Sequence, residues 1–123
     1  MKIEVSVGEI VDKFTILEIK EKHCLDQSKI INIQKELNYL KDVVDDLNIP
    51  EELIDDLREV NRKLWKIEDD IRLCENKWKF DDDFIQLARS VYYTNDKRFE
   101  IKNKINSLVE SNFREEKILP KYT

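Results

Sequence analysis

The segment LARSVYYTNDKRFEIKNKIN, residues 87–106, combines the apolar periodicity of a long helix with a polar interruption. Its apolar residues recur every three or four positions, which is the spacing of one helical face. These residues are Leu87, Val91, Ile101 and Ile105. Thr94 and Arg98 continue the same spacing on the same face. The segment therefore predicts a helix whose inner face contains polar groups.

The stretch at residues 53–74 has the pattern of a partner helix. Its inner face alternates spacings of four and three through Leu53, Leu57, Val60, Leu64, Ile67, Ile71 and Cys74. Each of the two predicted helices is ~40 Å long at a rise of ~1.5 Å per residue. Because the link between them is short, we expect an antiparallel αα-hairpin, with one of the aspartates at 81–83 capping its second helix.

Two further helices are predicted before the hairpin. Ser6 with Glu9 forms a capping box, so a helix is expected from about residue 7 to about residue 25. Ser28 is the expected cap of the next helix, and Pro50 fits the first turn of the one that follows. We predict an all-α helical bundle of about four helices built on the hairpin, with the first two helices covering its apolar side. The chain is expected to be a single domain, residues 1–123, with a short extended N-terminal arm and an extended tail at residues 112–123.

Composition excludes several classes of function. Charged residues make up 40% of the chain and the net charge is −5, which argues against a nucleic-acid partner. The single glycine, Gly8, excludes the glycine-rich loops that bind nucleotide phosphates. No apolar run is long enough to span a bilayer and no signal-peptide pattern is present, so we expect a cytoplasmic protein without membrane insertion.

Antiparallel pairing predicts that a polar layer lies between the two hairpin helices. Positions whose numbers sum to about 160 should be level, which places Trp65 opposite Asn95 and Asn61 opposite Arg98. The predicted layer consists of Asn61, Trp65, Glu68, Asp69, Arg72, Arg89, Tyr92, Asn95, Asp96 and Arg98. A buried arginine needs a carboxylate, and Glu68, Asp69 and Asp96 are the expected candidates for Arg98. Trp65 and Tyr92 are the expected walls of a small pocket.

Two interpretations of this layer stay open. Polar groups inside helical bundles fix register and oligomeric state at some cost in stability. The same groups could instead form a ligand or partner site.

Other candidate sites have weaker signals. His23 and its neighbour Cys24 point about 100° apart on a helix, and no nucleophile–base pair is predicted. Carboxylate pairs at metal-ligand spacing occur, as at Glu9 with Asp12, but 27 acidic residues in 123 make such pairs common by chance. We predict no metal site and no cofactor. Cys24 and Cys74 are expected to be free thiols.

Four segments resemble a family of small bacterial helical proteins classified as a domain of unknown function. They are VSVGEIVDKFTILEIK at 5–20, VNRKLWKIEDDIR at 60–72, FIQLARSVYYTNDKRFEIKNKIN at 84–106 and EEK at 115–117. The resemblance implies a short helical protein. It also implies a link to glycosyltransferase-type or tetratricopeptide-containing proteins, near which or fused to which some family members occur. It implies no catalytic residue.

The leading hypothesis is a cytoplasmic binding or accessory module that acts through the polar layer, as a homodimer and alongside a sugar-transfer enzyme as its protein partner. The first alternative is a small all-helical enzyme acting on a phosphorylated or sugar-nucleotide substrate, with Arg72, Arg89 and Arg98 binding anionic oxygens and with Glu68 or Asp69 holding a metal ion or a proton. The second alternative is a structural coiled-coil adaptor. The sequence does not decide whether the protein is an enzyme.

Overall fold

A computed structural model describes residues 1–109, 111 and 115–121 of the chain. Within these residues the regular structure consists of four helices and no strand, which confirms the predicted all-α helical bundle. The helices are α1 (Val7–His23), α2 (Gln27–Asp46), α3 (Glu51–Asn76) and α4 (Asp82–Leu108). The six residues that precede α1 form no helix and no strand.

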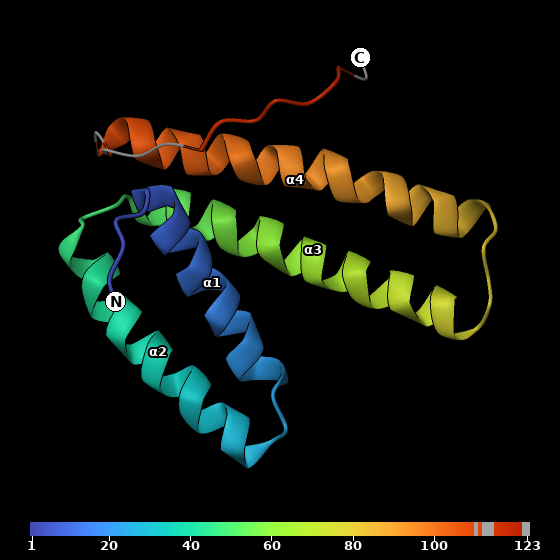
Figure 1. The fold of residues 1–123 in the computed structure, drawn as a ribbon, viewed down its shortest axis with the longest axis horizontal. Helices are drawn as coiled ribbons and strands as arrows, with labels where there is room; N and C mark the ends of the chain where they lie inside the picture. The colour runs from blue at the N-terminus through green and yellow to red at the C-terminus, as the bar shows by residue number, and fades with distance from the viewer. Residues whose placement is uncertain (110, 112–114, 122–123) are drawn as a thin grey trace.

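The helices form two hairpins that meet at α1. The long helices α3 and α4 lie side by side as the predicted antiparallel hairpin, and α1 crosses them near one end (Figure 1). Helix α2 packs on α1. Among the described helices, α1 is the one that packs on α2 and also on both α3 and α4. The expectation that the first two helices both cover the hairpin is therefore correct only for α1. The far half of the hairpin extends beyond α1 (Figure 1).

Local hydrogen bonds explain where the helices begin. Ser6 caps α1 as predicted, since its Oγ accepts a hydrogen bond from the Glu9 N–H at 3.3 Å. Asp26, not Ser28, caps α2: its Oδ1 accepts hydrogen bonds from the N–H and the Oγ of Ser28 at 2.9 and 2.7 Å. A carboxylate offers more acceptor positions than a hydroxyl, so the earlier residue takes the role. Asp81 caps α4 through the Phe84 N–H at 3.3 Å, as one of the predicted aspartates.

The hydrophobic core lies at the end of the molecule where α1 crosses the hairpin. Its buried members are Val11, Phe14, Leu17, Leu37, Val44, Ile49, Ile54, Leu57 and Ile105. In the far half of the hairpin, large apolar residues such as Leu73 and Ile85 are exposed. The core therefore fixes α1 against the hairpin and leaves the hairpin's far half without cover from the described chain.

The described part of the tail contacts α4. Glu115 Oε1 lies 2.7 Å from Lys102 Nζ, and Lys117 Nζ lies 5.5 Å from the centre of the Phe99 ring. Residues 115–121 form no helix and no strand. The remainder of the predicted tail, residues 112–114 and 122–123, lies outside the described residues.

Candidate functional site

The carboxylate of Asp12 joins three helices at the crossing of α1 with the hairpin. Asp12 is only 1% exposed and accepts hydrogen bonds from Asn61 Nδ2 at 2.9 Å and from Arg98 Nε at 2.8 Å. The Nη2 of Arg98 donates to the second oxygen of the same carboxylate. This bidentate pair is a strong, charge-assisted contact, and it raises the pKa of Arg98 above its ordinary value.

Thr15 completes the network around Asp12. Its hydroxyl donates to the Asp12 carbonyl oxygen at 2.8 Å and accepts from Asn61 Nδ2 at 2.8 Å. Both amide hydrogens of the buried Asn61 are thereby used. We call Asp12, Thr15, Asn61 and Arg98 the Asp12 network. It is a satisfied polar cluster inside the bundle, which rigidifies the place where α1, α3 and α4 meet.

The prediction of which carboxylate pairs with Arg98 is wrong. Its partner is Asp12 on α1, and not Glu68, Asp69 or Asp96. The prediction placed the first helix over the apolar side of the hairpin, whereas α1 lies over the polar interruption itself. Asp12 and Thr15 are three residues apart on one helical face, and that polar pair next to a buried stripe was the available signal.

Gly8 allows α1 to approach α4 closely. Its N–H donates to Asn106 Oδ1 at 2.7 Å, and a Cβ at this position would lie 2.6 Å from the Lys102 carbonyl oxygen. A Cβ atom cannot lie this close to a backbone oxygen, so the position requires glycine unless the backbone shifts. Because Gly8 is one turn before Asp12, the absence of a side chain helps to bring the Asp12 carboxylate to Arg98.

Lys102 forms a second buried ionic contact beside the Asp12 network. Its side chain is 7% exposed, and its Nζ lies 2.8 Å from Glu9 Oε2 and 2.7 Å from Glu115 Oε1. Burial lowers the pKa of Lys102, but the hydrogen bonds with Glu115 and Glu9 outweigh burial and raise this pKa above its ordinary value. Sequence reasoning missed Lys102 and Asn106, which lie off the stripe of residues 94 and 98.

A hollow of about 350 Å³ opens next to the Asp12 network, between α1, α3 and α4. We call it the polar hollow. It contains seven of the ten residues predicted for the polar layer: Asn61, Trp65, Glu68, Asp69, Arg72, Asn95 and Arg98. Apolar side chains also line it, namely Ile16, Ile19 and Leu64. The structure thus brings segments from three helices to one concave site.

Several polar groups of the hollow are uncommitted. Among the described residues, no hydrogen bond or ion pair engages the side chains of Glu68, Asp69, Arg72 or Asn95. Trp65 stacks on His23 with ring centres 5.3 Å apart and an interplanar angle of 21°. Acceptors, donors and one aromatic ring therefore surround an apolar floor, which is the composition of small-molecule sites.

Three predicted residues do not line the polar hollow: Arg89, Tyr92 and Asp96. At 100° per residue, Arg89 and Asp96 share one face of α4, which is turned away from the face of Asn95 and Arg98. The Tyr92 ring is 41% exposed and pairs with Tyr93, so it is not a wall of the pocket. Hydrogen bonding with Tyr92 and Tyr93 raises the pKa of Arg89.

The acidic pair Glu9 and Asp12, which has metal-ligand spacing, points to basic partners. Glu9 binds Lys102 and Asp12 binds Arg98, so this pair does not converge on one point. In the described part of the chain, no group of three or more histidine, cysteine or acidic residues could hold a metal ion. Cys24 and Cys74 are free thiols. None of the described helices has the length and apolar character that crossing a membrane requires.

The comparisons with known proteins give a family and no function. The model of the family of unknown function DUF6165 matches residues 1–120, and the chain belongs to that family. No curated protein and no solved structure matches it.

Proposed function

For this member of DUF6165, we propose the function of a cytoplasmic binding or accessory module. Its polar hollow binds a small, uncharged, hydroxyl-rich molecule of the saccharide class. The proposal joins the predicted polar layer to the geometry of the hollow. Nothing in it requires the chain to catalyse a reaction.

The observation that carries the proposal is the set of uncommitted polar side chains on an apolar floor. Carboxylates accept hydrogen bonds, a guanidinium donates them and an amide does both, so Glu68, Asp69, Arg72 and Asn95 can satisfy a ring of hydroxyl groups. The flat Trp65 ring in the lining offers an apolar surface for the carbon face of such a ring. The Asp12 network holds α1, α3 and α4 in place around the site.

The charges of the hollow favour this ligand over a phosphorylated or sugar-nucleotide substrate. That alternative needs three arginines to bind anionic oxygens. Arg98 is already paired with Asp12, and Arg89 does not line the hollow. The uncommitted ionic groups that remain are two carboxylates, Glu68 and Asp69, against the single guanidinium of Arg72. An excess of carboxylates repels a phosphate group placed in this hollow.

A fluorescence titration tests the proposal. The chain has two tryptophans, so Trp78→Phe leaves Trp65 as the only indole reporter, and Trp78 is 85% exposed. We expect neutral mono- and disaccharides to change Trp65 emission saturably. In the same background, Glu68→Leu should weaken binding about tenfold, since it removes a hydrogen bond to a charged group.

Glu75→Leu is the matched control, because Glu75 is an exposed carboxylate on α3 that does not line the polar hollow. It should leave the affinity unchanged. A titration in which both leucine variants bind as the parent does, or in which no saccharide alters the emission, would remove the support for a saccharide site.

Assembly as a homodimer and association with a sugar-transfer enzyme belong to the same proposal. Exposed apolar residues support the first: Ile31 and Tyr39 on α2 and Ile85 on α4 are each about half exposed or more. Light scattering tests it by comparing the mass in solution with the 14.9 kDa of one chain. The resemblance to a family with neighbours of the glycosyltransferase type supports the second, and co-purification with such an enzyme tests it.

A further inference from the structure

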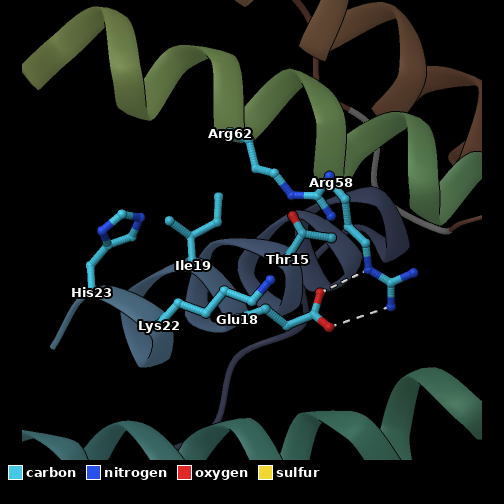
Figure 2. A pocket seen from close by; sticks show the side chains of 7 residues that line it. All are labelled: Thr15, Glu18, Ile19, Lys22, His23, Arg58 and Arg62. Carbon is cyan, nitrogen blue, oxygen red and sulfur yellow. Dashed lines mark hydrogen bonds and ion pairs between the residues drawn. The ribbon is translucent and has the colours of Figure 1, made fainter. Parts of the chain in front are cut away.

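A second hollow lies between α1 and α3, separate from the polar hollow. Its volume is about 120 Å³, and it is lined by Thr15, Glu18, Ile19, Lys22, His23, Arg58 and Arg62 (Figure 2). It shares only Ile19 with the lining of the polar hollow. We call it the basic hollow, because cationic side chains predominate in its lining.

Glu18, the carboxylate of the basic hollow, pairs with Arg58. Arg58 Nε lies 3.0 Å from Glu18 Oε1 (Figure 2). Arg58 Nη1 lies 2.7 Å from Glu51 Oε1 and 2.6 Å from Asp55 Oδ1. Burial lowers the pKa of Arg58, yet these hydrogen bonds raise it overall. Arg58 is thus committed to three carboxylates, of which Glu18 lines the basic hollow, and this leaves the binding of an anion to other groups.

Lys22 and Arg62 are the uncommitted charges. Among the described residues, no hydrogen bond or ion pair engages either side chain. Figure 2 shows them reaching from α1 and from α3 toward Thr15, so that two cationic ends point into the same small space. Like charges that converge repel each other, and an anion between them would turn this repulsion into attraction.

We propose that the basic hollow binds a phosphate group, as the free ion or as a monoester, between Arg62 and Lys22. A guanidinium matches two phosphate oxygens with parallel N–H groups, and a lysine ammonium adds a point charge. The volume admits one tetrahedral oxyanion and leaves any ester group outside the hollow. The site stands apart from the proposed saccharide site, because it shares no polar side chain with it.

Isothermal titration calorimetry of the full chain with inorganic phosphate tests the site, with chloride at equal ionic strength as the blank. We expect saturable binding of one phosphate per chain. Lys22→Gln and Arg62→Gln should each weaken it about tenfold, which is the effect of losing a charged hydrogen bond. Lys66→Gln is the matched control: it removes one positive charge from α3, and Lys66 pairs with Asp70 outside the hollow.

The outcomes separate cleanly. No saturable phosphate heat, or an equal loss of affinity in Lys66→Gln, would overturn the site. Methyl phosphate identifies the source: binding of both ligands supports a monoester site, and binding of inorganic phosphate alone supports a site for the free ion. Circular dichroism checks that each variant is folded. Should Arg62→Gln fail to fold, the exposed Lys22 decides the matter alone.

Discussion

Asp12 is the residue at which three helices depend on one another. Its carboxylate is 1% exposed and is satisfied by Asn61 on α3 and by Arg98 on α4. A buried charge of this kind is tolerated only while its partners remain, because desolvation of an unpaired carboxylate costs several kcal/mol. Because Arg98 is paired with Asp12, its guanidinium is not available to bind a ligand in the polar hollow.

Replacing Arg98 by methionine should therefore destabilise the protein by about 3 kcal/mol, the low end for breaking a buried pair, since Asn61 still donates to Asp12. Urea unfolding followed by circular dichroism measures the change. The double variant Asp12→Leu with Arg98→Met should recover much of the loss, because two apolar groups replace two charges. A single variant as stable as the parent would contradict the role of the pair.

At the scale of elements, α1 organises the bundle. It is the helix that reaches α2, α3 and α4, and Gly8 permits its close approach to α4. Lys102 on α4 then joins α1 to the tail, through Glu9 on one side and Glu115 on the other. The ionic contact at Lys102 therefore ties three segments of the chain together.

The raised pKa of Lys102 predicts how this contact responds to pH. A lysine whose pKa is higher in the folded state than its ordinary ~10.4 contributes stability that is fully present below about pH 10. This stability is lost as the pH rises through the folded-state pKa. The difference in free energy of unfolding between the parent and Lys102→Met should stay constant from neutral pH up to about pH 10 and shrink above it. Other titrating groups largely cancel in this difference, and a difference that grew with pH would contradict the assignment.

The hairpin was predictable because its information is local. The apolar residues within 53–74 and 87–105 recur at helical spacing, and the aspartate cap marks where α4 begins. The position of α1 was not predictable in the same way. Periodicity shows which face of a helix is apolar, but not which partner that face meets. Asp12 was therefore grouped with the many other acidic residues of the chain, although it is the buried partner of Arg98.

The candidate site was predictable only in part, for the same reason. Pairing level positions brought Asn61, Trp65 and Glu68 to the same hollow as Asn95 and Arg98. The rotation of α4 about its own axis decided the remainder, and it turned Arg89 and Asp96 away. The basic hollow was missed altogether, because its two cations come from α1 and α3, and the sequence did not show which faces of these two helices meet.

At the scale of the whole molecule, two hollows of different chemistry lie beside α1. The polar hollow has carboxylates, two amides and Trp65, whereas the basic hollow has Lys22 and Arg62, neither of which forms an ion pair within the described chain. The stacked pair of His23 and Trp65 has one ring in the lining of each. A hydroxyl-rich ligand and a phosphate group would thus bind at separate places on one rigid crossing of helices.

A ¹H–¹⁵N correlation spectrum, recorded while neutral saccharides are titrated in, tests the polar hollow most directly. Signals from the Trp65 indole N–H and the Asn95 side-chain amide should shift saturably together, and those of the exposed Trp78 indole should stay in place. Saccharides that leave both Trp65 and Asn95 unmoved, or that shift Trp78 as much as Trp65, would show that this hollow is not a binding site for them.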